Sequence, residues 1–405
     1  MRSLIARWGA WLLLVTIVSI CLAGAWALSL ATPLPAGDEF NVLRWELEHV
    51  PNKWLYLTDR FFTGRLSSRE EDERLGRYLL LTARIQQTER ALADEAAPSD
   101  DPRRDEVARL RSERDSLEND VEAAIEGRLT AVLEDEGLES SFPLFPDFRW
   151  AFPPVDFELD QPLLTLVLSH RDRVELIDQR PLQQGLSLEQ VVDIEGAEEA
   201  DGARSALVLG VAGAATYPSI VAPRAGYQDL AETVAHEWVH HYLAFQPLGQ
   251  RYFASLELKT LNETVANIAG KELGALLVGR YPLPGDVAAE LALLNPEPSV
   301  DPSPVLRQLR LDVEALLGEG LVDEAEGLME RRRLELEDGG VRFRRINQAF
   351  FAFRDVYADD PSSIDPIGLK LLTLRQREGS AEGFLREAAR LTSGGELDEL
   401  LSGGD

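Results

Sequence analysis

The chain has 405 residues, of which 45% are hydrophobic, and a formal net charge of −29. This length and composition allow one large domain or two ordinary domains with buried cores. The negative charge argues against a nucleic-acid-binding protein, because affinity for nucleic acid comes largely from neutralising phosphates. The single cysteine, Cys21, excludes an intramolecular disulfide and a cysteine-ligated structural zinc site.

The N-terminal segment, residues 1–37, is predicted to be a membrane anchor. Arg2 and Arg7 precede an uncharged, largely apolar run at residues 8–30, which is long enough to span a bilayer. By the positive-inside rule, we expect a single-pass protein of the cell membrane whose remaining chain lies outside the cytoplasm. The alternative is a signal peptide, cleaved near the Ala-Trp-Ala sequence at residues 25–27, followed by secretion.

Two segments of different character follow the anchor. Residues 38–65 are rich in aromatic side chains, which favour a membrane interface, and we interpret them as a juxtamembrane segment. Packing of these aromatics on the globular part is the alternative. Residues 66–140 carry two charged, heptad-like patterns separated by the proline-containing sequence AAPSDDPRR. They predict an antiparallel, coiled-coil-like helical hairpin, which would serve as a spacer or as a site for a protein partner.

The remaining chain is predicted to contain a connection and a larger domain. Residues 141–162 hold five prolines and are expected to form an extended connection. In residues 163–405, strand-like runs such as LLTLVLS come first, and helical patterns prevail after Gly226. Strands followed by helices indicate an α+β fold, mostly helical with a small mixed sheet.

The candidate metal site begins with the sequence HEWVH at residues 236–240, an HExxH motif within a helical pattern. Residues i and i+4 share one face of a helix, so His236 and His240 can bind the same metal ion. Two imidazole nitrogens at this spacing suit zinc, and Glu237 is placed to act on water as a general base. His241 is expected to point away from this face.

A third ligand is needed, and Glu263 is the candidate. The chain has no histidine beyond His241, which excludes a third histidine ligand downstream. Glu263 belongs to the next predicted helix, at about residues 255–278, and a helix–turn–helix hairpin can bring it beside the two imidazoles. Asn267, one turn further on, could accept the second ring N–H of a ligand histidine and fix its orientation.

HEWVH followed by NETVAN resembles the gluzincin group of zinc metallopeptidases, to which thermolysin belongs. The specific resemblance covers residues 227–270, and the chain as a whole resembles poorly characterised bacterial membrane-anchored proteins with the same core. It implies a zincin-like fold in which His236, His240 and Glu263 bind zinc and Glu237 is the general base.

The resemblance has further implications around this core. Asn267 stands where the group often has aspartate, so a neutral acceptor replaces a charged one. An edge strand before the motif helix pairs with the substrate in this group, and residues 205–213 occupy that place. The group often stabilises the oxyanion with a downstream Tyr or His; Tyr357 is the leading candidate here, with Tyr252 behind it. Arg344 or Arg345 is a further alternative.

These features predict a membrane-anchored, zinc-dependent peptidase that hydrolyses peptide bonds in a peptide or protein substrate. Water activated by the metal would be the nucleophile, with Glu237 as its general base. The alternative is a non-enzymatic, membrane-anchored interaction module in which the helical hairpin binds a partner and the metal site is vestigial or structural. An aminopeptidase would also need an acidic pocket for the free amine, which the sequence does not locate.

Overall fold

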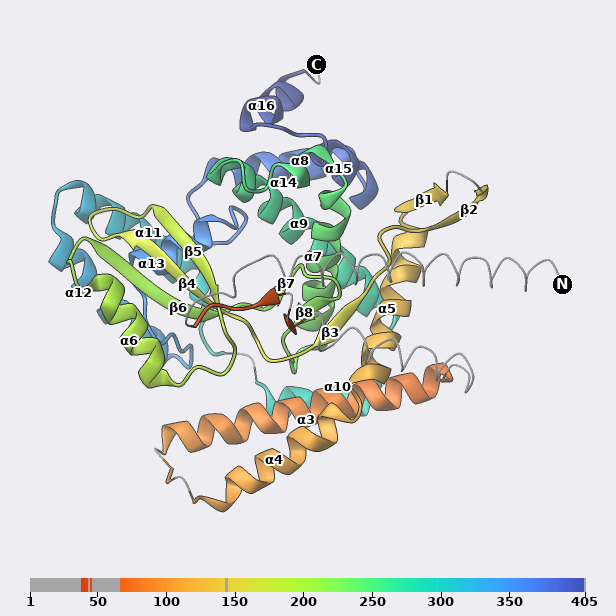
Figure 1. Ribbon diagram of the computed structural model, residues 1–405, viewed down its shortest axis with the longest axis horizontal. Coiled ribbons are helices and arrows are strands. Elements are labelled where there is room, and N and C mark those ends of the chain that lie inside the picture. Colours follow the sequence, from red (N-terminus) through yellow and green to blue (C-terminus); the bar gives the residue numbers. More distant parts are fainter. Residues whose placement is uncertain are drawn as a thin grey trace. The chain divides into compact units, whose positions relative to one another are not determined.

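Figure 1 shows the computed structural model, which describes residues 38–42, 44–45, 66–95, 97–98, 100–142, 145–296 and 298–403. The predicted membrane anchor lies outside these residues, as does most of the juxtamembrane segment. Across the part that is described, no helix is both long enough and apolar enough to cross a membrane. The chain divides into two compact units, Met1–Arg65 and Leu66–Asp405, and the second unit contains nearly all of the described residues.

The second unit opens with three helices, α3 (Ser68–Asp94), α4 (Pro102–Asp115) and α5 (Glu118–Asp135). A capping box between Ser67 and Glu70 starts α3, and Pro102 occupies the first turn of α4. The α3–α4 pair is the predicted hairpin, but its second arm is shorter than expected because the helix breaks at Ser116 and Leu117. After the break, α5 packs its apolar face into the main core of the unit.

In the described residues, eight strands precede the motif helix: β1 (Glu139–Phe142), β2 (Phe145–Ala151), β3 (Phe157–Leu159), β4 (Leu164–His170), β5 (Leu176–Leu182), β6 (Arg204–Gly210), β7 (Gly213–Ala214) and β8 (Ser219–Val221). They form an antiparallel β1–β2 ribbon, a mixed sheet of order β3-β8-β7 and an antiparallel sheet of order β5-β4-β6. The α+β class, mostly helical with a small mixed sheet, is confirmed, although the strands form three sheets rather than one.

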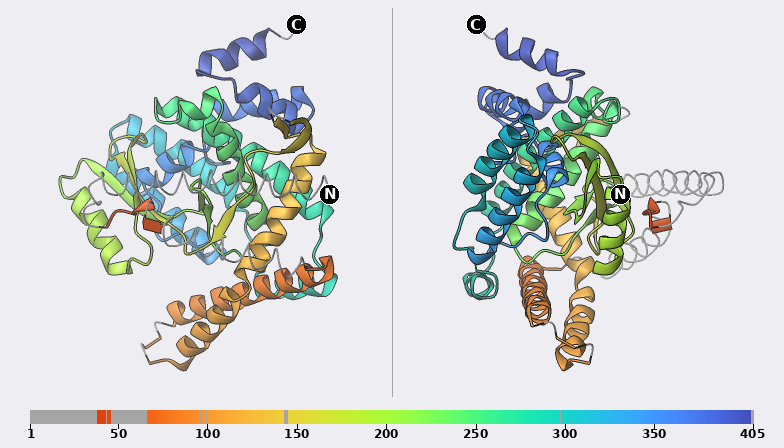
Figure 2. Two further views of the ribbon diagram at one scale, coloured as in Figure 1. Left: turned by 45° about the vertical axis from the view of Figure 1, so that its right-hand side comes forward. Right: turned by 90° about the vertical axis from the view of Figure 1, so that its left-hand side faces the viewer.

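The sheet of β4, β5 and β6 is buried on both faces. Leu166 and Leu168 of β4 pack with Val191 of α6 (Leu188–Glu199), whereas Val167 packs with the helices on the opposite face. Those helices are α11 (Pro302–Gly318), α12 (Val322–Asp338) and α13 (Gln348–Asp355). Figures 1 and 2 show the resulting three layers. Burial on both faces explains why β4 reads as a continuous apolar run rather than an alternating one.

The central helices are α7 (Tyr227–Ala244) and α9 (Leu256–Arg280), joined through the short α8 (Pro247–Gln250). The unit is completed by α10 (Gly285–Leu294), α14 (Pro366–Glu378), α15 (Ala381–Ala388) and α16 (Gly394–Ser402). The proline-rich segment is fastened to α7, because Trp238 Nε1 donates to the carbonyl of Pro153 at 2.8 Å.

Two glycines set the distance between α7 and α9. A Cβ added to Gly270 would lie 2.8 Å from His236 Cα, and one added to Gly274 would lie 2.7 Å from Glu232 Cα. Both separations are too short for real carbon atoms, so the two backbones meet without intervening side chains. This close approach places the metal-site residues of α9 directly opposite those of α7.

Candidate metal centre

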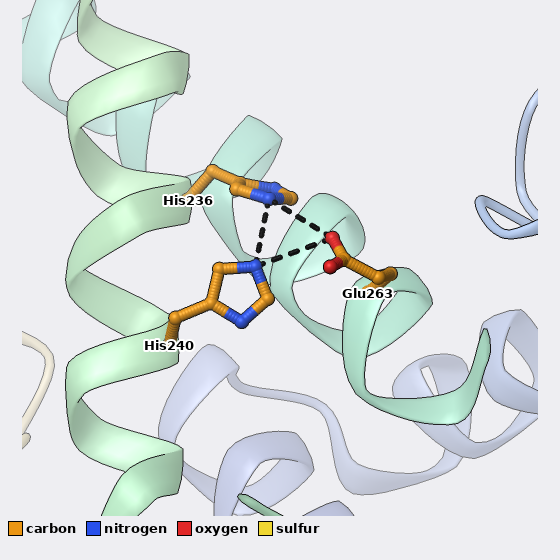
Figure 3. A group of neighbouring side chains, drawn as sticks. All are labelled: His236, His240 and Glu263. Atoms are coloured by element: carbon orange, nitrogen blue, oxygen red, sulfur yellow. Dashed lines mark hydrogen bonds and ion pairs between the residues drawn. The ribbon is translucent and has the colours of Figure 1, made fainter. Parts of the chain in front are cut away.

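The predicted ligands converge on one point between α7 and α9. His236 and His240 project from successive turns of α7, and Glu263 reaches them from α9 (Figure 3). All three side chains are largely buried, with 14%, 11% and 9% of their surfaces exposed, respectively. This arrangement agrees with the sequence prediction that the two histidines share one helix face and that Glu263 reaches them from the next helix.

The spacing of the three donor atoms fits a tetrahedrally coordinated metal ion. The two Nε2 atoms lie 3.0 Å apart, and Glu263 Oε2 lies 3.5 Å from His236 Nε2 and 3.3 Å from His240 Nε2. Zinc–ligand bonds of about 2.0–2.1 Å at the tetrahedral angle place ligand atoms roughly 3.3–3.4 Å apart. The three residues therefore form a group that can hold a metal ion.

The electrostatics of the group favour a cation. Burial alone would lower the pKa of His240, but the Glu263 carboxylate raises that pKa to about 9. Burial alone would raise the pKa of Glu263, but the imidazoles of His240 and His236 hold it well below its usual range. Both shifts show that positive charge is stabilised between these atoms, and a divalent metal ion supplies such charge.

The orientation of His240 is fixed by Asn262 rather than by the predicted Asn267. His240 Nδ1 lies 2.8 Å from Asn262 Oδ1, which only accepts, so Nδ1 carries the proton and Nε2 keeps its lone pair for the metal. Asn267 instead donates from Nδ2 to both carboxylate oxygens of Asp359, at 2.8 and 2.9 Å. The prediction of Asn267 is wrong because Asn262, which directly precedes the ligand Glu263, is the amide that reaches His240.

Tyr252 supports the carboxylate ligand. Its hydroxyl donates to Glu263 Oε1, which leaves Oε2 facing the two imidazoles. Its ring centroid lies 6.2 Å from that of His240. Tyr252 is the second candidate for oxyanion stabilisation from the sequence, but its proton is committed to the ligand carboxylate.

Glu237 is buried beside the three ligands. Burial raises its pKa, while the neighbouring imidazoles of His236 and His240 act in the opposite direction. Its carboxylate lies against the backbone of β7, because a Cβ added to Gly213 would meet Glu237 Cδ at 2.8 Å. Only glycine leaves room for this approach of strand and carboxylate.

The expected substrate-binding edge, residues 205–213, is closed along most of its length. The outward N–H groups of Ala206 and Val208 donate to Glu199 Oε1 at 2.9 Å and to Glu195 Oε1 at 2.6 Å. The outward carbonyls of the same two residues accept hydrogen bonds from other side chains, namely Arg345, Asn347 and Arg344. The prediction is wrong for β6, because side chains already satisfy the groups that strand addition would use.

The edge of β7 has a different environment. Gly213 lies opposite Val221, while the carbonyl of the preceding Ala212 accepts from Ala222 N at 2.8 Å. Since neighbouring residues of an antiparallel strand alternate in direction, the N–H and C=O of Gly213 point away from β8. β7 is the outer strand in the order β3-β8-β7, so these groups face the edge of the sheet beside Glu237.

Tyr357 lies beside His236. Its ring centroid is 6.3 Å from that of His236, and burial together with the charges of Glu263 and Glu237 raises its pKa well above the usual value. The phenol therefore stays protonated and can donate a hydrogen bond. The following residue is held to α9, because Ala358 N donates to Thr264 Oγ1 at 2.9 Å.

Two other predictions can be compared with the structure. Arg344 and Arg345 bond Glu195 and Glu199 beside β6, so they are wrong as oxyanion donors. His241 points away from the ligands, as expected, because its Nε2 lies 2.6 Å from the carbonyl of Thr216.

No protein-family model, curated protein or solved structure matches the chain. The gluzincin resemblance thus stays a prediction from two short motifs. A function for the chain is therefore inferred from the geometry of the ligands, Glu237, Gly213 and Tyr357.

Proposed function

We propose that this protein is a zinc-dependent peptidase. The observation that carries the proposal is the convergence of His236, His240 and Glu263 at tetrahedral spacing, with the buried carboxylate of Glu237 next to them. A structural metal site needs ligands only, whereas hydrolysis also needs a base. The strand β7, with main-chain groups that face outward beside Glu237, adds a means of holding an extended peptide.

Zinc held by the three ligands would supply a Lewis acid that polarises a carbonyl and acidifies water. Glu237 accepts the proton of the attacking water and passes it to the leaving nitrogen. The main-chain groups of Gly213 align the peptide backbone. The protonated phenol of Tyr357 donates to the oxygen on which negative charge develops.

The test compares two variants of the zinc-loaded full chain against a peptide library. Glu237→Gln should keep one zinc per chain and lower hydrolysis by about 10²–10⁴-fold, because the base is lost while the ligands stay. Glu263→Ala should lose zinc, measured by metal analysis after dialysis, since only two ligands remain. Glu232→Gln on α7 and Glu257→Ala on α9 are matched controls, expected to change neither quantity. Full hydrolysis by Glu237→Gln would refute the proposed role of the base.

A further inference from the structure

Among the described residues, the lysine that lies beside the metal centre has no charged partner. Lys259 is on α9, one turn before Glu263, and its Nζ lies 5.9 Å from the ring centroid of Tyr252. That ring holds Glu263 through its hydroxyl. Lys259 Nζ donates to Gln179 Oε1 of β5 at 2.6 Å, so its hydrogen-bond partner is a neutral amide.

The nearby carboxylates are committed elsewhere. Glu263 faces the two imidazoles and Tyr252, and Asp178, next to Gln179, pairs with Arg180 at 2.9 Å. Burial lowers the pKa of Lys259, and the charges of Glu263 and Asp178 offset that effect only in part.

The other lysines that the structure describes have different environments. Lys271 pairs with Asp359 at 2.7 Å, and Lys370 pairs with Asp398 at 2.6 Å. A half-buried ammonium group that has only a neutral partner loses hydration without gaining an ion pair. In a chain with a net charge of −29, an ammonium group in this state is available to an anion that arrives from outside.

We propose that Lys259, together with the side-chain amide of Gln179, binds a carboxylate of the peptide substrate beside the metal centre. The ammonium contributes a charge-assisted hydrogen bond, and the amide nitrogen of Gln179 is a second donor. The carboxylate belongs either to the free C-terminus of a short peptide or to an acidic side chain. This inference rests on the proposed peptidase function, since it names the class of substrate for that site.

The experiment measures binding, so that it does not depend on turnover. Full-length Glu237→Gln protein, loaded with zinc, is titrated calorimetrically with N-acetyl-trialanine and with its C-terminal amide. A second pair of amidated peptides carries glutamate or glutamine at the central position. We expect one acidic peptide to bind roughly 10–100-fold more tightly than its neutral match, the range typical of a hydrogen bond to a charged group. The pair that shows the difference identifies the source of the carboxylate.

Substitutions then assign the preference to Lys259. Adding Lys259→Met should abolish the preference while zinc content stays unchanged, and Lys259→Arg should restore part of it. Lys370→Met removes an equal charge from α14 and should leave the preference intact. Equal binding or no binding of all four peptides, or a preference that survives Lys259→Met, would overturn the inference. If binding is selective for the acidic peptide but protein that retains Glu237 cleaves no peptide, the proposed peptidase activity is refuted and the carboxylate site still stands.

Discussion

Two helix pairs of this protein are held together by different means. The α7–α9 pair, which carries the metal centre, meets backbone to backbone at Gly270 and Gly274 and buries its apolar side chains in the main core. In the α3–α4 hairpin, α4 buries a single residue, Val107, which packs on α3 in a small cluster separate from the main core. Charged pairs such as Arg77–Glu113 and Arg111–Glu89 join the two helices at their surface.

The difference shows where this fold tolerates change. Backbone contact leaves α7 and α9 little freedom to shift, which suits a metal site because ligands must be held within about 0.5 Å of the productive geometry. Exposed ion pairs hold the hairpin more loosely, because solvent competes with each pair. We therefore expect substitutions at the α7–α9 contact to affect both stability and metal binding, and substitutions in the hairpin to act locally and leave metal binding unchanged.

The largest effect is expected for Gly270→Ala. The added methyl group would meet the backbone of His236 and force α7 and α9 apart, at a cost of about 1–3 kcal/mol in the free energy of unfolding. Zinc affinity should fall as well, because His236 moves relative to Glu263. The methyl group added by Gly279→Ala on the same helix would meet no atom within 4 Å, so this variant should gain up to about 1 kcal/mol in the free energy of unfolding. Denaturant titration and a zinc-binding assay measure both variants, and equal stability of the two would show that the backbone contact at Gly270 does not hold α7 and α9 together.

A smaller, local effect is expected for Val107→Ala. Loss of about two buried methylene equivalents costs roughly 1.5 kcal/mol, which should loosen α4 from α3. Hydrogen exchange should accelerate in residues 102–115, while zinc content stays the same. Val192→Ala, at a valine that is 52% exposed, is the control. Loss of zinc from the Val107 variant would show that the hairpin supports the metal centre.

The smallest effect is expected for the Arg77–Glu113 pair. The two side chains are 63% and 44% exposed, so their interaction should contribute less than about 0.5 kcal/mol and decline further with salt. A double-mutant cycle with Arg77→Ala and Glu113→Ala measures this coupling. A value above about 1 kcal/mol would mean that the charged surface of the hairpin stabilises the fold after all.

The parts of the site that depend on helix periodicity could be predicted from the sequence. The i, i+4 spacing of His236 and His240, and the direction of His241 away from their shared face, follow from 3.6 residues per turn. Glu263 could be named because a second helical pattern follows a short turn and because its NETVAN sequence resembles that of the gluzincins. The order of strands before helices likewise indicated the fold class.

The parts that depend on tertiary contacts could not be predicted. The choice of Asn262 over Asn267 depends on how α9 rotates against α7, which Gly270 and Gly274 determine. The break after α4 depends on the packing of α5 into the main core. The closure of β6 depends on Glu195 of the preceding helix and on Arg344, which is distant in sequence. No local pattern contains this information.

The side chains that cover β6 have a consequence for solubility. Residues 205–210 of this strand read SALVLG, an uncharged, β-prone sequence of the kind that pairs with copies of itself when its edge is bare. Glu195 and Glu199 accept its outward N–H groups in the manner of a neighbouring strand. Each molecule thus satisfies the middle of its own sheet edge, so a second chain finds no free main-chain groups at Ala206 and Val208 on which a cross-β aggregate could grow.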